Sequence, residues 1–300
     1  MDHSSLSTAA RALSQALEPF VGSVYFSPEA HQRYERLGFA ASARKGNGVA
    51  MPDGPAYFTS RGSLLGHVPG EVVAAAFGVF NPVAVIASVA HGWTLTDAAT
   101  IREERQLGAV DLLARILGAH PDGIDSVVIS LQRAVEVCAP AGRPLFAGAV
   151  SGTVPTQPLA AAWFLGDCLR EYRGDCHTAA WVAAGLSATE IGLLTELWWG
   201  IPLHTYVRTR AWTEDQVNAS LDALRGRGLI DDGGFTDAGR ALRSGIEVAT
   251  DAQMKGPLAA LGEDLDAVVS LFNGWSRRVR DGFGYPMSGP EDLARLAGRS

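Results

Sequence analysis

The most constraining part of the sequence is the stretch from Leu186 to Thr250, where signals for helix starts and helix ends alternate at close spacing. Ser187-Ala-Thr-Glu190 has the residues of a capping box, and Gly200-Ile-Pro202 ends the helix that this box begins. A second helix fits 203–209, and Thr213 caps a third. The stretch therefore predicts three successive helices joined by short turns.

A hairpin and a further helix follow these three. The turn Asp231-Asp-Gly-Gly234 separates two short apolar segments, which is typical of a tight hairpin, and Asp237 leads into the last helix. Three helices followed by a hairpin form a winged helix, a shape that can place a recognition helix in the major groove of DNA.

The charges of this predicted winged helix do not suit DNA. Six arginines are balanced by six acidic residues between positions 201 and 244: Arg208, Arg210, Arg225, Arg227, Arg240 and Arg243 against Glu214, Asp215, Asp222, Asp231, Asp232 and Asp237. Acidic residues begin the helix that would contact bases and occupy the hairpin tip. Binding DNA requires a net positive face, so we expect weak or no DNA binding. A homodimer that assembles a basic surface from two chains is the alternative.

Composition narrows the remaining classes of protein. The 300 residues carry a net charge of −7, which argues against a non-specific binder of polyanions. The three cysteines form no CxxC pair, so we expect neither a disulfide framework nor a structural metal site. The N-terminus does not resemble a signal peptide, and no apolar run approaches the roughly 20 residues that span a bilayer. We expect a cytoplasmic protein with no membrane segment.

The rest of the sequence has mostly helical spacing, which predicts a mainly α fold. We expect a helical ligand-pocket domain over residues 1–185, packed on the winged helix over 186–250. A C-terminal helix and tail over 251–300 would fold back on one of them. The Pro- and Gly-rich segment 140–158 is interpreted as a connection.

The densest polar cluster is Arg170-Glu-Tyr-Arg-Gly-Asp-Cys-His177, on a predicted helix that ends near Gly174. Its two arginines would hold an anion, while the histidine and a carboxylate would supply acid–base chemistry. The alternative is a buried corner between helices, where Arg–Asp pairs and an aspartate cap fix the turn. If the protein is an enzyme, the catalytic residues predicted by this cluster are His177, Asp175 and Glu171.

Aromatic residues gather in the N-terminal part of the chain, with polar side chains beside them. We interpret Tyr57 to Leu65 as irregular backbone, which often lines a cavity when it carries aromatic residues and arginine. These residues would form an apolar pocket with a few polar anchors, and the alternative is ordinary hydrophobic core. The predicted ligand-binding residues are Tyr25, Tyr57, Phe58, Arg61, Phe80, Asn81, Trp163, Arg170 and Arg173.

Motifs for common catalytic and cofactor sites are absent from the sequence. It contains no GxSxG, HExxH, P-loop or GxGxxG pattern, and no two of its seven histidines have metal-ligand spacing on one helix face. We therefore expect no cofactor and no metal site. Any enzyme activity would be metal-independent acid–base chemistry, such as that of a lyase, isomerase or cyclase.

Several stretches resemble a family of actinobacterial winged-helix proteins that are mostly described as helix-turn-helix proteins. The resemblance covers nearly the whole chain and is carried by Leu17-Glu-Pro-Phe20, Phe58-Thr-Ser-Arg61, Phe80-Asn-Pro82 and the run from Leu169 to His177. The segments 221–229 and 235–240 are similar to the winged helix of MarR-type regulators. The resemblance implies a fold and no general activity. The family favours histidine where this chain has Tyr172, so no second histidine is expected to act there.

Together these observations predict a winged-helix protein that binds an apolar or aromatic small molecule. It would act as a sequestering or carrier protein, or as a ligand-sensing regulator, with a role in secondary metabolism. The alternatives are an acid–base enzyme that uses the cluster 170–177 and a dimeric DNA-binding transcriptional regulator.

Overall fold

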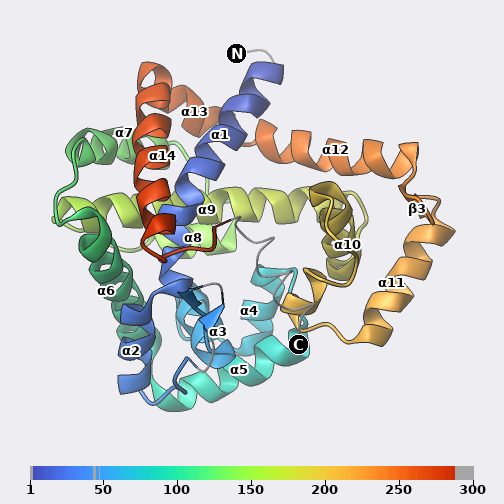
Figure 1. The fold of residues 1–300 in the computed structure, drawn as a ribbon, viewed down its shortest axis with the longest axis horizontal. Coiled ribbons are helices and arrows are strands. Elements are labelled where there is room, and N and C mark those ends of the chain that lie inside the picture. The colour runs from blue at the N-terminus through green and yellow to red at the C-terminus, as the bar shows by residue number, and fades with distance from the viewer. Residues whose placement is uncertain (1–2, 43–44, 47, 288–300) are drawn as a thin grey trace.

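The computed structural model describes residues 3–42, 45–46 and 48–287. This part of the chain is mainly α-helical, as predicted, with two hairpins of two-residue strands. Figure 1 shows the helices arranged around one long helix, α9 (Pro158–Ala183), with α11 and the second hairpin at one edge. Among the described residues, no helix is long and apolar enough to cross a membrane.

Helix α9 is continuous, so the predicted helix end near Gly174 is wrong. Gln157 caps its start by accepting a hydrogen bond from the Ala160 N–H, and Pro158 occupies the first helical position. A glycine inside a helix costs about 1 kcal/mol relative to alanine, and the extensive burial of α9 outweighs this cost. The helices packed most extensively against it among the described residues are α1 (His3–Gly22), α6 (Ala98–Leu117), α7 (Ile124–Glu136), α8 (Pro144–Val150) and α12 (Asp237–Ala252).

The C-terminal helices pack on the N-terminal half of the chain. Helix α14 (Leu265–Asp281) lies along α1 and also contacts α6, while α13 (Lys255–Leu261) contacts α7 and α1 (Figure 1). The rings of Phe20 and Phe272 meet edge to face with their centroids 5.2 Å apart. A short 3₁₀ helix, η4 (Gly262–Asp264), joins α13 to α14.

Two segments that were expected to be irregular contain helices. Tyr57–Leu65 lies in α3 (Gly54–Gly62) and in the 3₁₀ helix η2 (Ser63–Leu65), because Asp53 caps the Ala56 N–H and a proline occupies the first turn. The connection 140–158 contains α8. The remaining elements of the N-terminal half are η1 (Ser23–Phe26), α2 (Pro28–Arg36), β1 (Lys45–Gly46), β2 (Val49–Ala50), α4 (Gly70–Phe77) and α5 (Pro82–Leu95).

The stretch from 186 onward has the predicted order of elements with one difference. Capping boxes start α10 (Ala188–Trp199) and α11 (Glu214–Gly226), and the hairpin pairs β3 (Ile230–Asp231) with β4 (Gly234–Phe235). The second helix, predicted over 203–209, is only the 3₁₀ turn η3 (Val207–Arg210). His204 and Ala211 on either side of η3 have positive φ angles of 68° and 61°, which do not continue an α-helix.

The hydrophobic core has several parts, and α9 contributes to more than one of them. The largest cluster of buried side chains lies around α9, α1, α6, α7 and α14. A second cluster joins α10, α11 and the hairpin, and it includes Trp181 from the end of α9. A third cluster joins α3, α4 and α5 around Phe58 and Phe77. The long central helix therefore connects the N-terminal helices to the α10–α12 region.

Candidate ligand site

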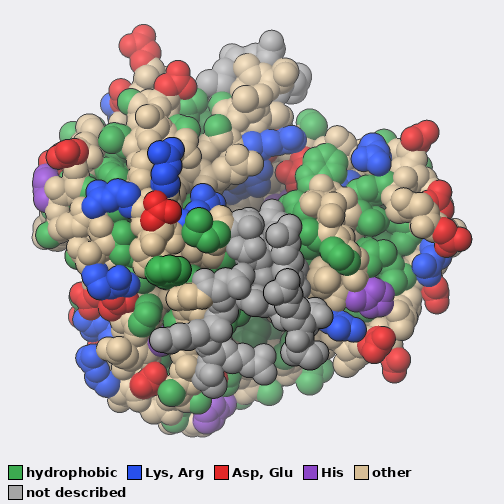
Figure 2. Space-filling view, in the orientation of Figure 1, with side chains coloured by type: hydrophobic (Ala, Val, Ile, Leu, Met, Phe, Trp, Pro, Cys, Tyr) green, Lys and Arg blue, Asp and Glu red, His purple; other side chains and the backbone are tan. Residues whose placement is uncertain are grey.

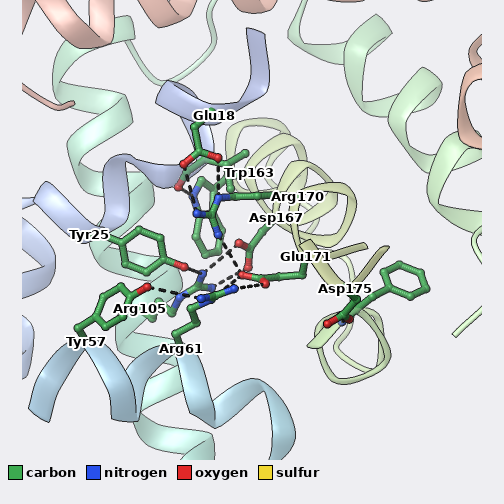
Figure 3. A network of polar contacts seen from close by, with 12 residues as sticks. Glu18, Tyr25, Tyr57, Arg61, Arg105, Trp163, Asp167, Arg170, Glu171 and Asp175 are labelled. Atoms are coloured by element: carbon green, nitrogen blue, oxygen red, sulfur yellow. Dashed lines mark hydrogen bonds and ion pairs between the residues drawn. The ribbon is translucent and has the colours of Figure 1, made fainter. Parts of the chain in front are cut away.

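A network of charged and aromatic side chains lies on one face of α9, against α1, η1, α3 and α6. Figure 3 shows these side chains converging from the five elements. Its charged members are three arginines and three carboxylates: Arg61, Arg105, Arg170, Glu18, Asp167 and Glu171. The charges of these six groups cancel, so the network is neutral as a whole.

Glu171 lies at the centre of the network and is fully buried. Arg61 donates to both of its carboxylate oxygens, from Nε at 3.0 Å and from Nη2 at 2.7 Å, and Arg170 Nη1 donates to Oε1 at 3.1 Å. Burial disfavours the ionised carboxylate, but the two guanidiniums outweigh this effect and lower the pKa of Glu171 to about 2. Glu171 is therefore a permanent anion that holds two cations together.

Arg105 and Asp167 form the most deeply buried pair. Arg105 Nη1 and Nη2 donate to the two carboxylate oxygens at 2.7 and 3.0 Å, and Nη2 also donates to the Tyr25 hydroxyl at 3.1 Å. The guanidinium lies 4.9 Å from the ring centroid of Trp163, whose indole N–H donates to the Val21 carbonyl. Arg105 Nε is buried and has no hydrogen-bond partner among the described residues.

The outer edge of the network is partly open to solvent. Arg170 donates from Nε and Nη2 to Glu18, at 2.8 and 3.2 Å, and Tyr285 donates to the same carboxylate at 3.2 Å. The side chains of Arg170 and Glu18 are 21% and 32% exposed, whereas Glu171 beside them is 0% exposed. A solute could therefore reach this edge but not the centre.

The predicted aromatic residues are brought together, and their rings contact one another. Tyr57 lies 5.0 Å from Tyr25, 5.2 Å from Phe58 and 5.7 Å from Phe80 between ring centroids, and Phe58 and Phe80 are 5.0 Å apart. Arg61 stacks on Phe77 from this cluster at 4.5 Å. Arg105 lies over both Tyr25 and Trp163, at 5.6 and 4.9 Å from the ring centroids. Buried rings in mutual contact are what the alternative, ordinary hydrophobic core, predicts.

Two predicted ligand residues have other partners. Asn81 caps α5 by accepting from the Val83 N–H, and its amide donates to the Ala211 carbonyl and to Gln216. Arg173 lies about one turn after Arg170 on α9, and its Nη2 donates to Asp251 on α12 at 2.7 Å. Both residues connect elements of the fold.

The three predicted catalytic residues do not meet. Glu171 binds the two arginines, whereas Asp175 accepts from the Phe146 N–H at 2.9 Å and so caps α8, which has no side-chain cap of its own. Figure 3 shows Asp175 apart from the hydrogen-bonded network. His177 Nδ1 lies 3.2 Å from the Thr250 hydroxyl oxygen on α12. The expected cap by Asp175 of a following helix is wrong, because α9 is unbroken and the cap serves α8.

Burial shifts the pKa values of Asp175 and His177 in the directions that favour their neutral forms. Burial raises the pKa of Asp175 to about 6, although the Phe146 N–H acts against this shift. Burial lowers the pKa of His177 to about 4; nearby Glu247 opposes this effect, and Arg243 and Arg173 add to it. An imidazole with this pKa is neutral near pH 7, so it can accept a proton but has none to donate as a general acid.

Sequence reasoning missed three members of the network: Glu18, Arg105 and Asp167. A signal for two of them exists in the sequence. Asp167 stands one turn before Glu171 in an otherwise apolar stretch, and Arg105 stands in a predicted helix that has to bury one face. A charge on the buried face of a helix requires a partner. The identity of that partner, 62 residues away, is not visible in the local pattern.

Comparison with known proteins places the chain in a family. A sequence model described as a helix-turn-helix family matches residues 10–286. The chain belongs to this helix-turn-helix family. Neither the curated proteins nor the solved structures contain a significant match to it. Family membership supports the helix-turn-helix part of the resemblance seen in the sequence, and its actinobacterial, winged-helix and MarR-like parts stay predictions.

Several arginines of the helix-turn-helix region are engaged within the protein. Arg243 is buried and pairs with Glu247 on α12, and Arg227 donates to Glu190 at 3.0 Å. Arg210 stacks on the rings of Phe80 and Tyr206. Arg243 and Arg227 are therefore each paired with a carboxylate of the protein, whereas the Arg210 guanidinium is held, among the described residues, by aromatic side chains alone.

The acidic residues of this region are exposed. Glu214 and Asp215 lie in the exposed first turn of α11, and Asp231 and Asp232 lie on the exposed hairpin. Figure 2 shows acidic side chains along the edge where α11 and the hairpin lie in Figure 1. Because Arg243 is buried and Arg210 is partly buried, while the six acidic residues are exposed, the surface of the helix-turn-helix region is more acidic than its sequence composition indicates.

Proposed function

We propose that this helix-turn-helix protein binds an acidic small molecule with an apolar or aromatic body, at the partly exposed edge of the network on α9. The observation that carries the proposal is the arrangement of Arg61 and Arg170 around Glu171. Two guanidiniums share one buried carboxylate, and Arg170 has its second carboxylate partner, Glu18, at the exposed edge.

The chemistry of this edge favours an anion. A ligand carboxylate could replace Glu18 on Arg170 without disturbing Glu171, because Glu18 is the more exposed of the two acids. Arginine offers a planar fork of donors that matches a carboxylate. Tyr57 and Tyr25 would supply an apolar surface beside it, since Arg170 lies 5.3 Å from the Tyr25 ring centroid and Tyr57 contacts that ring.

The helix-turn-helix region in this proposal has weak or no affinity for DNA and serves to hold or sense the bound molecule. The support is electrostatic, because phosphate binding needs free cations at the recognition surface and exposed acids lie there instead. Sequestration, transport and ligand sensing are the roles that fit this description. The structure does not support catalysis by Glu171, Asp175 and His177 acting together, because each of these side chains has a different hydrogen-bond partner.

The test is a binding measurement with a panel of aromatic carboxylates, such as phenylacetate and 2-naphthoate, and their uncharged primary amides. We expect the carboxylates to bind the wild-type protein by calorimetry and to raise its melting temperature, and the amides to bind at least about tenfold more weakly. Arg170→Met should remove this preference. Arg115→Met, which breaks the exposed pair with Glu29, is the matched control and should keep it. Equal binding of acids and amides, or no binding of either, would contradict the proposal.

A second candidate function is DNA binding by a dimeric regulator, and membership of a helix-turn-helix family favours it. A mobility-shift assay at low salt with genomic fragments separates the two candidates. The proposal made here expects no sequence-specific binding below micromolar concentration. Specific sub-micromolar binding would establish the regulator instead.

A further inference from the structure

Arg210 lies between an aromatic ring of the N-terminal helices and one of the helix-turn-helix region. Its guanidinium lies 4.6 Å from the ring centroid of Phe80 and 4.4 Å from that of Tyr206, and Nη2 donates to the Tyr206 hydroxyl. Its Nε is buried and has no hydrogen-bond partner within the described ranges. Among the described residues, no carboxylate pairs with the Arg210 guanidinium.

The arginines on the other side of the aromatic cluster differ in this respect. Arg61 has both oxygens of Glu171, and Arg170 has Glu18 and Glu171. A partly buried cation is costly unless an opposite charge or several hydrogen bonds compensate it. A ligand carboxylate would supply the opposite charge that Arg210 lacks.

The backbone around Arg210 is held firmly against the N-terminal helices. The Asn81 N–H donates to the Arg210 carbonyl at 2.9 Å, and the Asn81 side chain donates to the Ala211 carbonyl at 3.0 Å. The indole N–H of Trp212 donates to the Val79 carbonyl at 2.9 Å. The segment 79–81 thus fixes the turn before α11, and Arg210 is positioned over Phe80 by these contacts.

Phe80 links Arg210 to the site proposed above. Its ring contacts Tyr57 and Phe58, and Tyr57 lies beside Arg61, whose Nη1 is 3.5 Å from the Tyr57 hydroxyl. Guanidiniums from two parts of the chain therefore flank one aromatic cluster. One of them comes from α3 and the other from η3, in the turn of the helix-turn-helix region.

We infer that Arg210 is a ligand-binding residue that the helix-turn-helix region contributes to the site, where it binds a second acidic group of an aromatic ligand. The inference rests on the proposed function and extends it from the α9 network to the turn before α11. The ligand class is then an aromatic or apolar molecule with two acidic groups. A bound ligand would then contact both the N-terminal helices and the turn that precedes α11.

The experiment compares a monocarboxylate, phenylacetate, with the dicarboxylate 1,4-phenylenediacetate on the wild-type protein and on two variants. We expect the second carboxylate to strengthen wild-type binding about tenfold, as one charged hydrogen bond would. Arg210→Met should lose this gain and still bind phenylacetate. Arg208→Met, a change at an exposed arginine two residues earlier, should keep it. Arg210→Lys keeps the charge but not the fork, so it should retain part of the gain.

The outcomes separate this inference from the proposal on which it rests. If the wild-type protein binds phenylacetate and the second carboxylate adds nothing, or adds equally in Arg210→Met, Arg210 is a structural clamp and only this inference is overturned. If the wild-type protein binds neither acid, both fall. Circular dichroism and the melting temperature identify a variant that has lost its fold, and Arg210→Lys then decides the question.

Discussion

Arg61 and Glu171 lie 110 residues apart in the sequence and meet inside the protein through two parallel hydrogen bonds of 3.0 and 2.7 Å. This pair joins α3 to α9, and it is screened from water because Glu171 is fully buried and the Arg61 side chain is only 12% exposed. Such a pair adds little net stability compared with apolar residues of the same size. It specifies instead which helix faces meet.

The first prediction follows from the cost of leaving a buried cation without its partner. Glu171→Gln should lower the free energy of unfolding by about 3 kcal/mol, because Arg61 and Arg170 lose the charge they share. Urea denaturation measures the change. Glu103→Gln on the exposed face of α6 is the control and should change it by less than about 0.5 kcal/mol. A similar small effect for both variants would show that the network does not hold α3 on α9.

The second prediction concerns pH and Glu196, a buried residue of α10 that accepts from the N–H groups of His204 and Val207. Burial raises its pKa from 4.5 to about 7, although the backbone donors act against the shift. The folded protein therefore binds this proton more tightly than the unfolded chain does. The stability that Glu196 contributes is complete below pH 4.5 and is lost as the pH rises to about 7.

Urea denaturation at pH 5 and pH 8 tests this effect. We expect the free energy of unfolding contributed by Glu196 in the wild-type protein to fall by on the order of 2 kcal/mol from pH 5 to pH 8. Glu196→Gln should not show this fall. Glu214→Gln, at an exposed position of α11, should leave the loss as it is in the wild-type protein. An unchanged pH dependence in Glu196→Gln would contradict the expectation.

The third prediction has the opposite sign and concerns His177. Burial lowers its pKa from 6.5 to about 4, so the unfolded chain takes up this proton before the folded protein does. Stability should therefore fall as the pH drops from 6.5 to about 4, and His177→Gln should reduce that fall. Proton NMR of the imidazole measures the pKa directly. Titration near 6.5 would show that His177 is hydrated and would restore its candidacy as a general acid.

The fourth prediction compares two glycines of α12. A Cβ at position 239 would lie 1.8 Å from the Leu229 carbonyl oxygen, whereas a Cβ at position 245 would meet nothing within 4 Å. Gly239→Ala should lower the free energy of unfolding by about 1–3 kcal/mol through this overlap. Gly245→Ala should raise it by up to about 1 kcal/mol through helix propensity. Thermal denaturation of both variants measures the difference, and equal effects would mean that α12 approaches the hairpin less closely.

Local features of the helix-turn-helix region could be predicted from the sequence because they depend on residues a few positions apart. The capping boxes of α10 and α11 each involve a side chain and an N–H group three residues away. The hairpin between β3 and β4 closes through the two-residue turn Asp232-Gly233, a pair that favours such turns. The mainly helical class likewise follows from spacing repeated along the chain.

The candidate site was only partly predictable, because its contacts join residues that are far apart in the sequence. Arg61, Arg170 and Glu171 stood out as polar residues near aromatic ones, but their partners depend on how α3, α1 and α9 pack. The sequence cannot show that Asp175 caps a helix 29 residues earlier, because a free N-terminus becomes a partner only when α8 is packed beside α9. Gly174 also indicated a helix end, but α9 continues through it because the surrounding helices bury both of its halves.

Composition and local spacing determined the helices, caps and hairpin of this protein. Tertiary packing decided which charges meet, because ion pairs between distant segments form only where buried helix faces bring them together.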